Sequence, residues 1–164
     1  MLNKMVLMLT ILLLVIALSG CAESRESRIP LDSETFVYVI ENRNDIEWDD
    51  WTYNASGYRH NQALAMYLLT LDVRYRIRFA EFISIAYAES EYNAGVSNLR
   101  RRADIPTPTE TDGRNFNLAV LQNETNYILL YRIENTLLVG ELRLPEYIDE
   151  FIDLINELKA HTID

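Results

Sequence analysis

Hydrophobic and polar positions follow their clearest pattern in the last third of the chain. Residues 116–121, 127–133 and 136–142 are rich in leucine, β-branched and aromatic side chains, and short polar connections at 122–125 and 134–135 separate them. This composition is typical of strands. Because both connections are short, the three strands are expected to pair as an antiparallel meander.

An amphipathic helix is expected after these strands. Pro145 lies where the first turn of a helix accepts a proline. Apolar residues then recur at helical spacing: Ile148, Phe151, Ile152 and Ile155. Asp149 and Glu150 come early in the segment, where the helix dipole favours negative charge. The pattern predicts a helix with one apolar stripe that packs on the core and one acidic face exposed to solvent.

The first half of the chain has a less regular pattern. Residues 35–40 are β-branched and aromatic, which predicts a strand. Residues 61–71 carry apolar side chains at helical spacing, which predicts a helix. Apolar side chains then fall on the odd positions of 73–87, which predicts a long strand with a bend or bulge near residues 80–82. The alternative is that the helix of 61–71 continues through this stretch.

A second helix and a loop are expected in the middle of the chain. Ser90 is a candidate N-cap, and the arginines of 100–102 suit the end of a helix. Three apolar residues between them have helical spacing: Tyr92, Val96 and Leu99. Residues 103–114 contain two prolines and a glycine and are expected to form a loop.

The order of these elements predicts the fold class. Strands and helices alternate irregularly and end in a three-strand meander followed by a helix. Helices that lie on one face of an antiparallel sheet bury both apolar surfaces. We therefore expect an α+β fold, a two-layer arrangement in which an antiparallel sheet carries the helices on one face, formed by residues 35–164 as a single domain.

The first residues have the pattern of a secretory signal. A short head with one basic side chain, Lys4, precedes an apolar run from Met5 to Leu18 that is broken only by Thr10. The run of about 14 residues is shorter than the roughly 20 that a membrane-spanning helix needs. A charged head, a short apolar core and small residues at its end indicate a segment that is removed after export.

This segment ends in Leu18-Ser19-Gly20-Cys21, which resembles the lipobox of bacterial lipoproteins. The resemblance covers only residues 1–21. It implies that Cys21 receives a diacylglyceryl group on its sulfur, that cleavage follows between Gly20 and Cys21, and that the new amino terminus is acylated. A plain signal peptide with a chance cysteine and an uncleaved signal anchor are the alternatives.

The resemblance sets the expected domain organisation and location. Residues 1–20 are the expected signal peptide, and 21–34 the lipidated cysteine with a polar tether. The domain is then lipid-anchored on the extracytoplasmic side of a bacterial cell membrane or outer membrane, with Ala22 permitting the latter. Two or more acyl chains give stable anchoring where a single chain does not.

Composition excludes several classes of partner and site. The formal net charge of -10 argues against nucleic acid, whose binding depends on Lys and Arg at phosphates. The same charge repels anionic lipid head groups, so the lipid must hold the protein at the membrane. Cys21 is the only cysteine, and the two histidines, His60 and His161, lack ligands at metal-binding spacing. We expect no metal and no cofactor besides the covalent lipid.

Two aromatic–acidic pairs make the first candidate binding site. Trp48, Asp49, Asp50 and Trp51 are consecutive. Aromatic faces stack on sugar rings and attract cations, and the aspartates suit hydroxyl or ammonium groups. The structural alternative is that the tryptophans dock this segment on the core.

Three arginines make the second candidate site. Arg74, Arg76 and Arg78 would project from one face of a strand, as an anion-binding row. The structural alternative is that acids on neighbouring strands pair with them.

The sequence reveals no assembled set of catalytic residues. The leading hypothesis is a non-enzymatic envelope lipoprotein that binds another envelope component, either a protein or a cell-wall polymer. The alternatives are a cell-surface enzyme or small-ligand receptor, and a structural or immunity-type surface protein.

Overall fold

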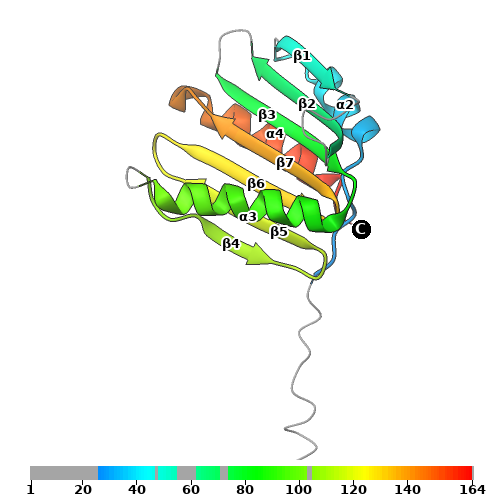
Figure 1. Ribbon diagram of the computed structural model, residues 1–164. Helices are drawn as coiled ribbons and strands as arrows, with labels where there is room; N and C mark the ends of the chain where they lie inside the picture. Colours follow the sequence, from blue (N-terminus) through cyan, green and yellow to red (C-terminus); the bar gives the residue numbers. More distant parts are fainter. Residues whose placement is uncertain (1–25, 47, 55–61, 71–73, 103–104, 164) are drawn as a thin grey trace, which may run out of the picture.

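The structure is a computed structural model that describes residues 26–46, 48–54, 62–70, 74–102 and 105–163; for 49–54 and 67 it describes the backbone alone. The elements follow in the order α2 (Ser33–Asn42), β1 (Trp48–Asn54), β2 (Gln62–Thr70), β3 (Tyr75–Phe82), α3 (Ile85–Arg101), β4 (Thr109–Asp112), β5 (Phe116–Gln122), β6 (Tyr127–Ile133), β7 (Thr136–Leu142), the 3₁₀ helix η1 (Pro145–Tyr147) and α4 (Ile148–Ala160) (Figure 1).

All seven strands form one antiparallel sheet in the order β1-β2-β3-β7-β6-β5-β4. It consists of two meanders, β1 to β3 and β4 to β7, which meet where β3 pairs with β7. The chain passes from one meander to the other through α3 (Figure 1). The predicted α+β class, the antiparallel sheet and the meander of β5, β6 and β7 are confirmed. β4 extends this meander at its outer edge, inside the segment 103–114 that was expected to be a loop.

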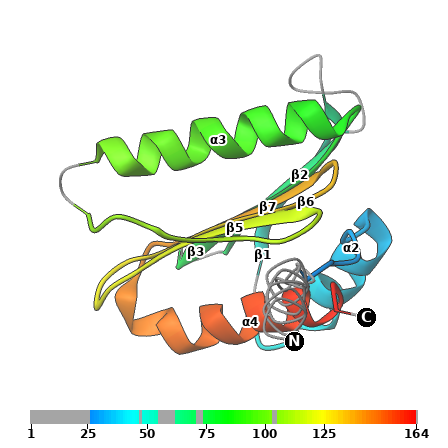
Figure 2. The ribbon, with the colours of Figure 1, turned by 90° about the horizontal axis from the view of Figure 1, so that it is seen from below.

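Helices cover both faces of this sheet. Figure 2 shows α3 on one side, and α2 and α4 on the other. The expected two-layer arrangement with helices on one face is therefore wrong. The reason lies in the central strands, because β6 is buried at all seven positions. Leu129 and Tyr131 belong to the core under α2 and α4, whereas Ile128 and Leu130 belong to the core under α3. A sheet that is apolar on both sides needs cover on both sides.

The C-terminal helix packs as its pattern predicted. Phe151 and Ile155 are fully buried, and Ile148 and Ile152 are partly buried against the same core. Pro145 opens η1, which leads directly into α4. The helix approaches β7 closely at Gly140, where a Cβ atom would lie 2.8 Å from Cζ of Phe151.

Residues 35–40, expected to be a strand, belong to helix α2. The signal that decides this is local: Asp32 is the N-cap, and its Oδ1 accepts a hydrogen bond from the Thr35 N–H at 2.6 Å. Phe36, Val39 and Ile40 are fully buried on one side of the helix. Helical burial of these three side chains outweighs their preference for strands.

Residues 61–71, expected to be a helix, contain strand β2. The misleading signal is the spacing of Leu64 and Leu68. Residues four apart lie on the same side of a strand as well as of a helix. In the structure Leu64, Met66 and Leu68 are buried under α2 and α4, and Ala65 lies on the opposite face.

The predicted strand of 73–87 is confirmed over Tyr75–Phe82, and the alternative of a continuous helix is wrong. The strand ends early because the chain bends at Ile83 and Ser84, just past the position expected near residues 80–82, and then enters α3. Ser84 is the N-cap, with its Oγ accepting from the Tyr87 N–H at 3.4 Å. The helix expected from Ser90 thus begins at Ile85.

The segment just before α2 is part of the folded domain. The Arg28 N–H donates to Oδ1 of Asn115 at 2.9 Å, and the Ile29 N–H donates to the Thr162 carbonyl at 2.9 Å. Leu31 is buried in the core. The expected domain boundary at residue 35 therefore moves back to at least Glu26, and the expected tether shortens accordingly.

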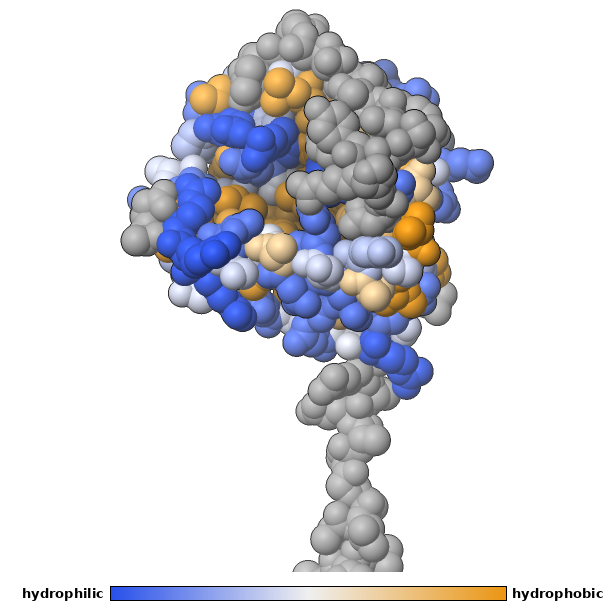
Figure 3. Space-filling model, in the orientation of Figure 1, coloured by the Kyte–Doolittle hydropathy of each residue, from blue (hydrophilic) through white to orange (hydrophobic). Residues whose placement is uncertain are grey.

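The surface is mostly hydrophilic, with hydrophobic residues gathered in a few places. On the face that carries α3, Figure 3 shows one such group at the right-hand margin, over the beginning of that helix. The described large hydrophobic side chains that are exposed are Ile29, Tyr38, Ile83, Ile85, Tyr87 and Ile163.

Candidate functional site

The lipobox residues Gly20 and Cys21 lie outside the described residues. The structure therefore leaves the expected cleavage and lipidation as predictions from the sequence. Within the described part of the chain, no helix is long and apolar enough to cross a membrane.

The aromatic–acidic stretch forms β1, an edge strand of the sheet. Trp48 packs partly buried against the core under α2 and α4, and its ring meets Tyr75 edge-on with centroids 5.9 Å apart. This matches the alternative in which the tryptophan docks its segment on the core. The side chains of Asp49, Asp50 and Trp51 lie outside the described set, so the proposed platform stays a prediction.

The structure does not bring the three arginines together on one face. Arg76 and Arg78 alternate with the buried side chains of β3 and lie on the face of α3, where Arg78 pairs with Glu91 at 3.2 Å. Arg74 instead pairs with Glu150 of α4 at 3.1 Å on the other face.

Each of these arginines has an acidic partner. Arg76 pairs with Glu141, its direct cross-strand neighbour on β7. Arg74 also lies over the Tyr147 ring, 4.4 Å from its centroid. For Arg76, the pair with Glu141 matches the alternative of cross-strand ion pairs. For Arg74, the contacts with Glu150 and Tyr147 hold α4 and η1 against the sheet.

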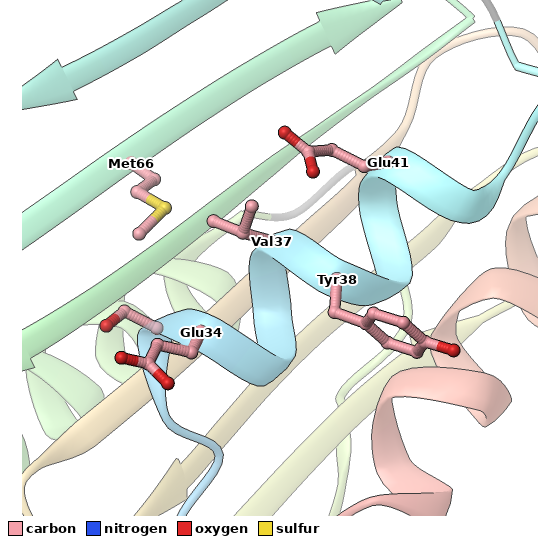
Figure 4. A pocket seen from close by; sticks show the side chains of 6 residues that line it. Glu34, Val37, Tyr38, Glu41 and Met66 are labelled. Atoms are coloured by element: carbon pink, nitrogen blue, oxygen red, sulfur yellow. The ribbon is translucent and has the colours of Figure 1, made fainter.

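Helix α2 presents a candidate site that the sequence did not indicate. Four of its side chains recur at the i, i+3, i+4 and i+7 spacing of one helix face: Glu34, Val37, Tyr38 and Glu41. Together with Ser33 and with Met66 of β2 they line an open groove of about 390 Å³ (Figure 4). Val37 and Met66 lie along its apolar floor, and the two glutamates lie at either end of it.

The groove is acidic at its rim. Glu34 and Glu41 are two helical turns apart, which separates them by about 10 Å along the axis. A third carboxylate, that of Glu81, accepts a hydrogen bond from the Ser33 N–H at 3.2 Å. Among the described residues that line the groove there is no lysine or arginine. An apolar floor between carboxylates suits a ligand that has apolar groups flanked by positive charge.

Ion pairs hold α2 in place beside α4. Arg43 follows the helix and donates to Asp45 at 2.8 Å and to Glu157 of α4 at 3.2 Å. The hydrogen bond from Arg43 lowers the pKa of Asp45 below its ordinary value. The pair with Glu157 fixes α2, the outer wall of the groove, relative to α4.

Sequence reasoning missed this site because it assigned α2 to a strand and β2 to a helix. The signal that was present is the Asp32 cap three residues before Thr35, followed by buried residues at helical spacing. Among the described residues there is no group of three acidic, histidine or cysteine side chains that could hold a metal ion.

Comparisons with known proteins assign no family. No family model matches the chain, and no curated protein matches it. A similar solved structure is the crystal structure of a GTP binding regulator from Thermotoga maritima, with 13% sequence identity and a TM-score of 0.49, covering 87% of this chain and 99% of that one.

Proposed function

We propose that this protein is a lipid-anchored lipoprotein of the bacterial envelope that binds another envelope component and does not catalyse a reaction. The observation that carries the proposal is the ending Leu18-Ser19-Gly20-Cys21 behind a short apolar run with a basic head. A domain displayed from a membrane by its first mature residue is suited to capturing a partner at that surface.

The groove on α2 supports a binding role. It is open, it combines an apolar floor with carboxylates, and it lies beside Tyr38, whose side chain is 62% exposed. Tyrosine is enriched at protein interfaces because its ring buries apolar area and its hydroxyl remains hydrogen-bonded. We propose that the groove receives a basic, partly apolar segment of an envelope protein.

The anchor is tested by expressing the full chain and its Cys21→Ser variant in a bacterium. We expect the wild type in the membrane fraction, with a mass that corresponds to a chain beginning at Cys21 plus diacylglyceryl and acyl groups. We expect the variant to keep residues 1–20 and to carry no lipid. An unlipidated wild-type chain would rule out the anchor.

The binding site is tested by photo-cross-linking in living cells. A photoreactive amino acid replaces Tyr38, and the same replacement at Glu124, in the β5–β6 turn, serves as control. We expect a discrete cross-linked protein only from position 38. The double variant Glu34→Lys/Glu41→Lys should abolish it because both rim charges reverse, whereas Glu124→Lys should leave it unchanged. Equal cross-linking from both positions would contradict the site.

A further inference from the structure

Five exposed hydrophobic side chains lie at one end of the domain. Ile83 is 61% exposed and Ile163 is 56% exposed. The others are Ile29, Ile85 and Tyr87. They come from three separate parts of the chain: the segment before α2, the start of α3, and the end of the chain after α4. Exposed apolar side chains gathered at one end of a domain make that end a candidate interaction surface.

Hydrogen bonds connect these three segments at that end of the sheet. The Phe82 N–H, next to Ile83, donates to the Asn135 carbonyl at 2.8 Å, and the Glu134 N–H donates to the Asn115 carbonyl at 2.9 Å. Asn115 in turn donates through Nδ2 to the Arg28 carbonyl at 2.8 Å. Figure 1 shows the start of α3, the C-terminus and the segment before α2 along the same side of the molecule.

The bond from the Ile29 N–H to the Thr162 carbonyl completes the connection, because it places Ile29 beside Ile163. The five side chains thus occupy the end at which the described chain begins. We name this surface, formed by Ile29, Ile83, Ile85, Tyr87 and Ile163, the apolar end.

The apolar end also includes, through Ile29, the part of the domain that is nearest to the proposed anchor along the chain. Only four residues, 22–25, separate Cys21 from Glu26. Five steps of the backbone span at most about 18 Å. This limit keeps the start of the folded domain close to the bilayer, whereas a tether reaching residue 34 would allow about 40 Å or more.

We propose that the apolar end rests on the lipid bilayer, with its isoleucines at the boundary of head groups and acyl chains. This inference rests on the proposed lipid anchor. When a surface is held beside a membrane, moving its apolar side chains from water into the interface lowers the free energy. Tyr87 suits the same depth, because its ring is apolar and its hydroxyl is polar. The net charge of -10 gives no attraction to anionic lipid, so hydrophobic contact is what orients the domain.

The test uses the full lipidated chain, purified from bacterial membranes and reconstituted into phosphatidylcholine vesicles. With Cys21 occupied by lipid, an introduced cysteine is the only free thiol. An environment-sensitive fluorophore is attached at Ile83→Cys, and at Glu124→Cys as the matched control in the β5–β6 turn. We expect quenching by aqueous iodide to be about threefold weaker at position 83, because the interface shields the probe from water.

A second variant tests whether the isoleucines of the apolar end cause the shielding by their contact with the bilayer. In Ile83→Asp/Ile85→Asp, a fluorophore at Ile163→Cys should become as open to iodide as the one at position 124. Both substituted residues are exposed, so folding should be unaffected, which circular dichroism checks.

Three results would overturn the inference or its basis, and they are distinguishable. A mass that shows no lipid on Cys21 refutes the proposed anchor. A lipidated chain with equal quenching at positions 83 and 124 refutes membrane contact alone. Shielding at position 83 in native membranes but not in protein-free vesicles would assign the apolar end to a partner protein instead.

Discussion

The two faces of the sheet are built from different kinds of side chain. Under α2 and α4 the core contains aromatic pairs: Phe36 stacks on Phe79 with ring centroids 4.9 Å apart, and Phe151 contacts Tyr75 at 4.9 Å and Tyr127 at 5.6 Å. Under α3 the core is made mainly of small and aliphatic residues, among them Ala65, Ala80, Ala88, Ala119, Val96 and Leu99.

The two cores therefore differ in how closely the helix packs on the sheet and in how much apolar area each residue buries. The face of α3 is filled by small residues, so the helix lies close to β6, and Gly95 contributes because a Cβ there would overlap with Cδ2 of Leu130. The face of α4 is filled by rings, which bury more apolar area per residue. We therefore expect most of the free energy of unfolding to depend on the aromatic face.

The largest expected effect comes from removing the central ring of that face. Phe151→Ala should lower the free energy of unfolding by about 4 kcal/mol, and Leu99→Ala, under α3, by about 2 kcal/mol. Urea unfolding followed by circular dichroism measures both, with Leu154→Ala, the same truncation on the aromatic face, as a milder variant if Phe151→Ala does not fold. An equal or larger loss in Leu99→Ala would mean that the two faces contribute alike.

The two glycines at which helices approach the sheet give a matched pair. Gly140→Ala should destabilise by about 2 kcal/mol, because its Cβ would meet the buried side chains of Phe151 and Ile155 on α4. Gly95→Ala should change stability by less than about 1 kcal/mol, since alanine favours the helix while the tip of Leu130 must move. Thermal or urea unfolding of the two variants decides; a larger loss at Gly95 would show that α3 is the less tolerant helix.

Alkaline pH should separate the tyrosines of the two faces. Burial raises the pKa of Tyr92, under α3, to about 12, and also raises the pKa of Tyr75, Tyr127 and Tyr131 on the aromatic face. The unfolded pKa is about 10. The contribution of these four tyrosines to the free energy of unfolding is therefore complete below pH 10. It is lost as the pH rises towards the pKa of each tyrosine in the folded state, by about 1.4 kcal/mol per pH unit for each tyrosine.

Tyr92→Phe isolates the contribution of the α3 face to the loss of stability at alkaline pH. The Tyr92 hydroxyl is buried without a hydrogen-bond partner among the described residues, so its removal should be nearly neutral at pH 7. At pH 11 the variant should be more stable than the wild type by about 1.4 kcal/mol. Urea unfolding at pH 7, 10 and 11 provides the measurement. Parallel losses in the two proteins would place all the alkaline sensitivity on the aromatic face.

The smallest effect is expected from the ion pair on the surface of the α3 face. Arg76 pairs with Glu141, but its side chain is 56% exposed. Arg76→Ala should cost about 0.5 kcal/mol at low salt and less at 1 M salt, because solvent and ions screen such pairs. Urea unfolding at both salt concentrations tests this. A loss that does not change with salt would indicate that the arginine stem, not its charge, packs on the sheet.

The elements predicted well are those whose local pattern has one interpretation. Strands β5, β6 and β7 are separated by short turns, and in the turn of 134–135 Glu134 takes a positive φ of 51°, as a tight hairpin requires. The stripe of α4 has only the helical period, and Pro145 opens the 3₁₀ turn η1 that leads into the helix. Neighbours in sequence are here neighbours in space, so local chemistry was sufficient.

The elements predicted wrongly are those whose local pattern suits two structures or favours the wrong one. Leu64 and Leu68 have a spacing that suits helix and strand equally, and only pairing of β2 with β1 and β3 makes it a strand. Residues 35–40 prefer strands locally, but the apolar space beside β3 and α4 and the Asp32 cap make them a helix.

The sequence by itself determined the α+β class, the C-terminal meander and α4, and it carries the lipobox pattern on which the proposed anchor rests. These features depend on residues that are adjacent along the chain. Only the tertiary structure decided that helices cover both faces, that the segment from Glu26 is folded against the domain, and that α2 and β2 enclose a groove. Each of these depends on burial between segments far apart in sequence, which no local period encodes.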